Sequence, residues 1–332
     1  MGKLNTGKVP NDILRTIVFG RLGREDASVI LGPSVGEDSA LIELNGRVVA
    51  FKSDPITGSV EEVGLLSVYV NANDIATRGA VPRWFLQCIL LPQGYSTADL
   101  EAICLQIDKA TKEIGVSVVG GHTEVTPGIS KPLVIGSMIG LIEDGKYLTT
   151  SGSQPGDSLF MTKSAGIEGT AILSSEKAIA SKFGGDFVQT CKGLIRLINV
   201  VGECLILRDQ NVTSIHDLTE GGLLGGVWEV AEASCSGVLL DLRPVPVLRE
   251  TELVCQELGL DPFRLISSGS VVFTIPPEHE EAAEAALRMA GIQCTRIGRM
   301  LPPSEGRSFI DRSGVMHHLD PPSTDELWRG LH

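Results

Sequence analysis

The residues of this sequence that are best suited to chemistry are carboxylates in glycine-rich loops, near a strand end, or inside an apolar helix pattern. They are Glu37 and Asp38 in "GPSVGEDSALI", Asp54 in "FKSDP", Asp74 after Asn73, Glu124 after "VVGG", and Asp217 in "IHDLTEGG". If several of these carboxylates converge, divalent cations must relieve their repulsion, and oxygen-rich ligand sets select Mg²⁺. A carboxylate–Mg²⁺ cluster beside glycine loops is what polyphosphate binding needs in a chain without a P-loop. The spacing leaves open a second interpretation, in which Asp38, Asp54 and Glu124 are exposed or capping carboxylates.

Asp74 is the carboxylate least compatible with a purely surface role. It follows Val68, Tyr69 and Val70 and precedes Ile75 within one apolar helix pattern. A charge buried there without a partner is costly. The alternative is a helix-interior aspartate that a neighbouring turn satisfies.

The stretch "SVVGGHTE" (117–124) places two glycines, a histidine and a glutamate directly after β-forming residues. It is compatible with an ordinary turn, a histidine metal site, or a phosphate-binding loop. No second histidine stands at ligand spacing, which favours a turn histidine at His122. The motifs G-x-x-x-x-G-K-[ST], G-x-G-x-x-G and H-E-x-x-H are absent, which excludes the commonest phosphate-loop and zinc-protease patterns.

The composition narrows the functional classes further. The chain has 332 residues, 42% of them hydrophobic, and a formal net charge of −13. This charge argues against a broad nucleic-acid surface. The apolar runs are too short for a membrane span, and the N-terminal residues lack a secretory pattern, so we expect a soluble cytoplasmic protein. The seven dispersed cysteines indicate reduced thiols rather than disulfides or a zinc site.

The pattern of the first half predicts alternating strands and helices that position these carboxylates. Strands are expected at 45–56, 84–91, 116–119 and 133–143, with a helix at 61–78. A second helix begins at the capping box of Ser96 and Asp99 and ends at Gly115.

The segment 149–166, rich in Gly, Ser and Thr, is a plausible junction to a second half. There the pattern predicts helices near 168–180 and 187–208, the segment 215–234, and a strand followed by a helix at 267–292. Alternation of this kind predicts a mixed α/β fold with two domains, residues 1–150 and 151–332.

Together the segments resemble one family. The ordered set "GEDSA" (36–40), "KSDP" (52–55), "NANDIATRGAVP" (71–82), "VVGGHTEVTPG" (118–128) and "HDLTEGGLLGGVWEVAE" (216–232) is similar to the aminoimidazole ribonucleotide (AIR) synthetase superfamily over about residues 30–300. The resemblance is closest in style to the hydrogenase-maturation HypE proteins. It implies a two-domain PurM-like fold whose N-terminal domain binds ATP with Mg²⁺ and pairs into a barrel across a homodimer.

The resemblance also implies roles for individual residues. Metal ligands would be Asp38, Asp54, Asp74 and Asp217. Nucleotide contacts would come from Gly36, Asp38, Asn73, Gly120, Gly121, Thr123, Gly221 and Gly222, and the catalytic residues would be Asp74, Asp217 and Glu124. The loop "KSAGIEG" (163–169) would border the acceptor.

The activity implied is an ATP-dependent transfer of the γ-phosphoryl group to an amide-type or phosphate acceptor, either a small molecule or protein-borne, without nucleic-acid or membrane partners. The alternatives are a thiamine-monophosphate-kinase-like enzyme and a non-catalytic nucleotide-binding partner in a maturation complex. Three departures from the family pattern bear on this choice. His122 and Glu220 stand where acidic and Arg residues are common, and the last cysteine is Cys294, whereas HypE proteins end in an acceptor cysteine.

Overall fold

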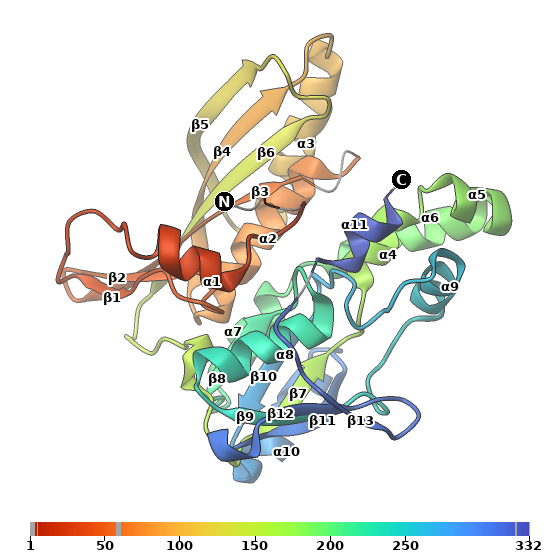
Figure 1. Ribbon diagram of the computed structural model, residues 1–332. Helices are drawn as coiled ribbons and strands as arrows, with labels where there is room; N and C mark the ends of the chain where they lie inside the picture. The colour runs from red at the N-terminus through yellow and green to blue at the C-terminus, as the bar shows by residue number, and fades with distance from the viewer. Residues whose placement is uncertain (1–3, 5, 58–60, 323, 332) are drawn as a thin grey trace. The chain divides into compact units, whose positions relative to one another are not determined.

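The computed structural model describes residues 4, 6–57, 61–322 and 324–331. These residues form two compact units (Figure 1). The large unit consists of the described residues of 1–26, 33–37 and 148–332, and the small unit consists of those of 27–32 and 38–147. Each unit has its own mixed sheet with helices, which confirms the predicted mixed α/β fold.

The small unit is built on a six-stranded sheet in the order β1-β2-β3-β6-β4-β5. The strands are β1 (Val29–Leu31), β2 (Ala40–Leu44), β3 (Arg47–Ile56), β4 (Val81–Leu91), β5 (Ser117–Val125) and β6 (Leu133–Ile142). Side chains along β6 alternate between buried and half-buried, as expected for a strand with one face on a helix layer. All neighbouring strands are antiparallel except β4 and β5, which are parallel.

Two helices pack on this sheet. Helix α2 (Val63–Thr77) lies against β3, β4 and β6, and nearly all of its residues are buried. Helix α3 (Thr97–Glu113) packs on α2 and begins at the predicted capping box of Ser96 and Asp99. A helix enclosed in this way is apolar around most of its circumference, which explains the long apolar pattern around Asp74.

The stretch 117–124 is wrongly predicted as a strand followed by a loop. Strand β5 continues through both glycines to Val125 and pairs with β4 along its whole length. The backbone of Gly121 has φ of +152°, and a Cβ atom there would lie 1.9 Å from the carbonyl oxygen of Gln87. Gly121 therefore allows two strands to approach closely, and neither glycine forms a turn.

The large unit has a seven-stranded sheet in the order β13-β12-β9-β11-β7-β10-β8. Its strands are β7 (Ser158–Thr162), β8 (Ser214–Asp217), β9 (Gly237–Asp241), β10 (Val271–Ile275), β11 (Cys294–Leu301), β12 (Arg307–Ile310) and β13 (Met316–His318). Strands β7 and β10 are buried along their whole length, and their Phe160 and Phe273 rings stack 5.2 Å apart.

The helices of the large unit include an N-terminal segment, α1 (Asn11–Ile13) with the π-helical turn η1 (Leu14–Val18). The others are η2 (Thr150–Gly152), α4 (Ile167–Leu173), α5 (Lys177–Phe183), α6 (Gly185–Gly193), η3 (Leu194–Leu197), α7 (Val201–Arg208), α8 (Gly222–Ala233), α9 (Arg249–Leu258), η4 (Pro277–His279), α10 (Glu280–Met289), η5 (Pro303–Glu305) and α11 (Glu326–Gly330). The two helices predicted near 168–180 and 187–208 are each divided, into α4 and α5 and into α6, η3 and α7. In the described part of the chain, no helix combines the length and the apolar character needed to cross a membrane.

Candidate functional site

Three of the predicted carboxylates, Asp38, Asp54 and Asp74, lie together in the small unit beside the C-terminal half of α2. The Nζ atom of Lys52 is 3.0 Å from Asp74 Oδ2 and 3.2 Å from Asp54 Oδ2. A carboxylate oxygen of Asp38 lies within 4.8 Å of one of Asp74. A loop, a strand and a helix thus bring three carboxylates and one lysine to the same place.

Asp74 is 2% exposed, and its carboxylate forms an ion pair with Lys52, which lies on another element, β3. Its backbone carbonyl accepts hydrogen bonds from Ser39 Oγ at 2.8 Å and from Thr77 Oγ1 at 2.9 Å. The Asp74 carboxylate is therefore not satisfied by its own helix alone. The ion pair with Lys52 compensates part of the cost of burying the charge.

Asn71 fixes Asp54 relative to α2. The Asp54 N–H donates to Asn71 Oδ1 at 2.8 Å, while Asn71 Nδ2 donates to the Asp54 carbonyl at 3.2 Å and the Ser67 carbonyl at 2.8 Å. This clamp joins β3 to the helix at the point where the carboxylates meet. Asn73, predicted to contact nucleotide, is fully buried on the same helix.

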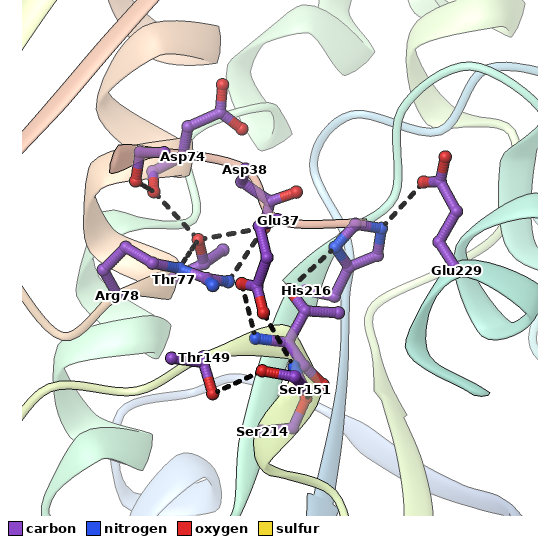
Figure 2. A network of polar contacts seen from close by, with 12 residues as sticks. Glu37, Asp38, Asp74, Thr77, Arg78, Thr149, Ser151, Ser214, His216 and Glu229 are labelled. Atoms are coloured by element: carbon purple, nitrogen blue, oxygen red, sulfur yellow. Dashed lines mark hydrogen bonds and ion pairs between the residues drawn. The ribbon is translucent and has the colours of Figure 1, made fainter. Parts of the chain in front are cut away.

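Asp38 is held by the end of α2. Its Oδ2 accepts hydrogen bonds from Thr77 Oγ1 at 3.1 Å and from Arg78 Nη2 at 3.0 Å, as Figure 2 shows. Arg78 is fully buried, so this ion pair is shielded from water and orients the Asp38 carboxylate firmly. The sequence carried a signal for Arg78 that was missed: it stands one helical turn after Asp74.

Lys52 is the second residue that sequence reasoning missed. Burial would lower the pKa of its ammonium group, but the carboxylates of Asp74, Asp54 and Asp38 hold that pKa above its ordinary value. The lysine therefore stays charged. Its signal was the spacing of two residues from Asp54 on one strand, which places both side chains on the same face of the sheet.

The residues predicted on 120–124 lie elsewhere in the small unit. Gly120, Gly121, Thr123 and Glu124 are all on β5, which is exposed along its length. Glu124 Oε2 is 3.1 Å from His122 Nε2, and hydrogen bonds from Thr126 and His122 lower the Glu124 pKa.

In the sheet, Asp54 pairs with Gly136, Gly136 with Gln87, and Gln87 with Gly121. Three strand spacings separate Asp54 from Gly121, which corresponds to about 14 Å. Within one chain, Glu124 is therefore not brought to the three aspartates.

In the large unit, Glu37 accepts two backbone hydrogen bonds from the turn η2. Thr150 N–H donates to its Oε2 at 2.9 Å and Ser151 N–H donates to its Oε1 at 3.0 Å (Figure 2). The Glu37 carboxylate thus has a structural role in holding this turn. Gly36, predicted to contact nucleotide, packs on α8, where a Cβ atom would lie 2.8 Å from the Glu229 carbonyl oxygen.

A buried polar chain adjoins this turn. The His216 ring lies between Thr150 Oγ1 at 3.5 Å and Glu229 Oε2 at 3.2 Å, and Lys8 Nζ lies 2.8 Å from Glu229 Oε1. Figure 2 shows the His216 ring directed at Glu229. Burial would raise the pKa of Glu229, but Lys8 and His216 together lower it to about 2. The N-terminal segment is thereby fastened to α8 by charge, since Arg15 also pairs with Glu232.

Asp217 ends β8 and is buried, directly before the glycine-rich turn into α8. The N–H of Gly221 donates to Asp325 Oδ2 at 2.6 Å, and the N–H of Gly222 donates to the Thr219 carbonyl at 3.0 Å. Asp325 also accepts hydrogen bonds from Ile266 and Leu327 N–H groups. A carboxylate of this chain therefore already lies at the start of α8, where the resemblance predicts nucleotide contacts.

The predicted acceptor loop contains a buried acid. Glu168 is 5% exposed and lies in the first turn of α4. Burial raises the pKa of Glu168 to about 7, with a further contribution from nearby carboxylates such as Asp325 and Glu220. Glu220 and Asp325 also line a cavity of about 300 Å³, together with Leu4, Lys8, Asn11 and Ile13.

Comparison with known proteins agrees with this architecture. Residues 36–142 match the N-terminal domain, and residues 154–311 the C-terminal domain, of AIR synthase related proteins. Carbamoyl dehydratase HypE from Azotobacter vinelandii is 31% identical over 261 residues, which cover 76% of this chain and 74% of that protein. The chain belongs to the AIR synthase-related family.

Two further relatives place the chain on the HypE-like side of this family. A putative hydrogenase expression/formation protein from Methanocaldococcus jannaschii is 28% identical over 287 residues, covering 85% of this chain and 84% of that protein. A crystal structure of HypE in complex with ATP superposes with a TM-score of 0.69 at 24% identity, covering 96% of this chain and 94% of that chain. The predicted PurM-like fold and membership of an ATP-dependent enzyme superfamily are confirmed.

Proposed function

We propose that this AIR synthase-related protein binds ATP with Mg²⁺ and transfers the γ-phosphoryl group to an amide-type acceptor. The observation that carries the proposal is the convergence of Asp38, Asp54 and Asp74 in the small unit. Three carboxylates on separate elements give the oxygen donor set that Mg²⁺ prefers, and they fit such an ion.

In this proposal Asp38, Asp54 and Asp74 hold the ion, which neutralises phosphate charge when nucleotide is bound. The residues around them keep the carboxylates in place. Arg78 and Thr77 fix the Asp38 side chain, and Asn71 fixes the strand that carries Asp54. Little covalent chemistry is required of the protein in phosphoryl transfer, so rigid positioning of this kind is its main contribution.

The predicted domain roles are retained in the proposal. The N-terminal domain assigned to 1–150 would bind ATP and form the dimer, and the loop 163–169 of the C-terminal domain, 151–332, would border the acceptor. Asp217, Gly221 and Gly222 would act from the second domain, as the resemblance implies. The N–H of Gly221 already has Asp325 as its acceptor, so nucleotide binding at this point requires Asp325 to be displaced.

An amide-type acceptor is favoured over a phosphate ester by the cavity whose carboxylates also act on Glu168 of the acceptor loop. It presents the carboxylates of Glu220 and Asp325, whereas its lysine, Lys8, is paired with Glu229. A phosphate ester would meet net negative charge there, and a neutral amide would not. The name carbamoyl dehydratase, carried by the Azotobacter relative, is compatible with this choice, and hydrogenase maturation is the pathway we propose.

A homodimer is part of the proposal. Strand β5 lies at the end of the sheet order, and its Val118, Val119 and Val125 are 42%, 55% and 58% exposed. Trp84 on the neighbouring strand adds a further exposed aromatic ring. Exposed apolar side chains on an unpaired edge strand favour an interface, and a second copy is the partner that the family resemblance implies. In such a dimer Glu124 would act at the boundary between the two chains.

The decisive experiment is a screen of amides, thiocarboxamides and phosphate esters for ADP release with Mg–ATP. We expect turnover with an amide-type compound, on its own or attached to a protein. Strong turnover of thiamine monophosphate would instead assign the chain to the kinase branch. Absence of turnover with every acceptor, together with ATP-dependent binding of another protein, would favour the non-catalytic alternative, which the departures at His122 and Glu220 support.

A further inference from the structure

The ammonium group of Lys52 supplies a positive charge to the carboxylate cluster in the small unit. Lys52 Nζ lies 3.0 Å from Asp74 Oδ2 and 3.2 Å from Asp54 Oδ2, and its side chain is 20% exposed. Both distances are those of close ion pairs. The ammonium group therefore contacts two of the three carboxylates to which the proposed function assigns Mg²⁺.

The carboxylates around Lys52 are divided between Lys52 and Arg78. Asp38 is turned toward Arg78 and Thr77 at the end of α2, and Asp54 and Asp74 face Lys52 from β3 and α2. Lys52 and Arg78 thus each serve one side of the cluster. Two fixed positive charges oppose three carboxylates, which leaves a net charge of about −1 by formal count.

From this arrangement we propose that Lys52 is a built-in competitor for divalent cations, which fills one cation position of the cluster and limits metal binding until nucleotide arrives. This inference rests on the proposed function in that it assumes Asp54 and Asp74 to be metal ligands. With Lys52 in place, most of the repulsion between the carboxylates is offset in the metal-free protein. A divalent ion that takes Asp54 and Asp74 must move the lysine away, and the phosphates of ATP are a suitable new partner for its ammonium group.

The test is the binding of Mn²⁺ alone, without nucleotide, to Lys52→Met, measured by electron paramagnetic resonance of free Mn²⁺. We expect the variant to bind Mn²⁺ at least about tenfold more tightly than the unmodified protein, or to bind one additional ion, because an opposing unit charge is removed. Lys52→Arg keeps the charge and should behave like the unmodified protein. Lys109→Met is the matched control, since Lys109 is exposed on α3 of the same unit.

A second readout uses thermal unfolding in the absence of metal. Lys52→Met should unfold at a lower temperature than the unmodified protein, and Mg²⁺ should restore most of the difference. If the variant folds only in the presence of Mg²⁺ or Mn²⁺ while Lys52→Arg folds without metal, the proposal is supported. If divalent ions do not rescue a Lys52→Met variant that fails to fold, the proposal is refuted.

Equal Mn²⁺ affinity and stoichiometry in Lys52→Met and the Lys109→Met control would also refute the inference. A Lys52→Met variant that loses only Mg–ATP affinity would assign the lysine to phosphate binding alone, and competition with metal would be wrong. Failure of the proposed function has a different signature: the unmodified protein and all variants would then bind neither Mn²⁺ nor Mg–ATP.

Discussion

Replacement of Asp74 by Asn tests the carboxylate cluster most directly, because it removes one charge with almost no change in shape. The backbone carbonyl of residue 74 keeps its hydrogen bonds from Ser39 and Thr77, so α2 should remain intact. The variant loses the ion pair with Lys52, which retains Asp54 as a partner. Because Lys52 keeps this second carboxylate, we expect the loss in the free energy of unfolding to stay below the about 3–5 kcal/mol of a buried charge left without a partner.

The effect on Mg–ATP binding should be larger. Two unit charges about 4 Å apart interact by about 4 kcal/mol at an effective dielectric constant of about 20. Part of this is offset, because Asp74 no longer holds Lys52 and the lysine is available to the phosphates. A net loss of at least about 1.4 kcal/mol remains, which corresponds to at least a tenfold weaker affinity.

Isothermal titration calorimetry with Mg–ATP measures this loss, and circular dichroism verifies that the variant is folded. Asp108→Asn is the matched control: Asp108 lies on α3 of the same unit, pairs with Lys112 and is 56% exposed. The control should bind Mg–ATP like the unmodified protein. Unchanged affinity in a folded Asp74→Asn variant would remove Asp74 from the site and refute the reasoning.

Three further predictions concern stability, each measured by urea unfolding. Glu168 has a pKa of about 7 in the folded protein and 4.5 as its ordinary value, so between these pH values only the folded state keeps its proton and stability falls as pH rises. Glu168→Gln should remove this decrease in the free energy of unfolding, which amounts to about 3 kcal/mol in total. If the variant shows the same dependence of the free energy of unfolding on pH between 4.5 and 7, the prediction is contradicted. Lys8→Met should lower the free energy of unfolding by about 1 kcal/mol at pH 7, a figure discounted for the exposure of Lys8. The Glu229 pKa of about 2 lies below its ordinary value of 4.5, so this carboxylate contributes stability that is present above pH 4.5 and is lost as the pH falls toward 2. Lys8→Met should therefore move acid unfolding to higher pH. Lys8→Arg should restore both properties, and an acid transition unmoved by Lys8→Met would exclude the ion pair as its cause. Gly121→Ala should cost about 3 kcal/mol by forcing β4 and β5 apart, whereas Gly120→Ala, with its nearest atom at 3.8 Å, is the control; equal losses would contradict the close approach at Gly121.

The mixed α/β fold and the capping box at Ser96 were predictable from the sequence because they depend on local periodicity and on short-range hydrogen bonds. The site was predictable in part. The placement of Asp74 inside an apolar helix indicated a buried charge, but its partner, Lys52, comes from a strand 22 residues earlier in the chain. Pairing across elements of this kind depends on the packing of α2 on the sheet.

The stretch 117–124 shows the opposite case. Two successive glycines are common in turns, and the local pattern therefore predicts a turn here. Their position in β5 is decided by the neighbouring strand, since the carbonyl of Gln87 leaves no room for a side chain at residue 121. Glu37 was likewise predictable only as a candidate carboxylate, because its hydrogen bonds to the η2 turn come from a segment more than a hundred residues away.

The contacts of Asp325 also bear on how the chain tolerates processing near its C-terminus. This residue accepts hydrogen bonds from the N–H groups of Gly221, Ile266 and Leu327, so a segment late in the sequence completes the glycine-rich turn that follows Asp217. A protease that cuts before Asp325 would leave the buried Gly221 N–H without its acceptor, at a cost of about 1–3 kcal/mol. Cleavage before Asp325 would then destabilise the start of α8, more than a hundred residues earlier in the sequence. Limited trimming would therefore change the glycine-rich turn before α8 and not only the segment that is removed.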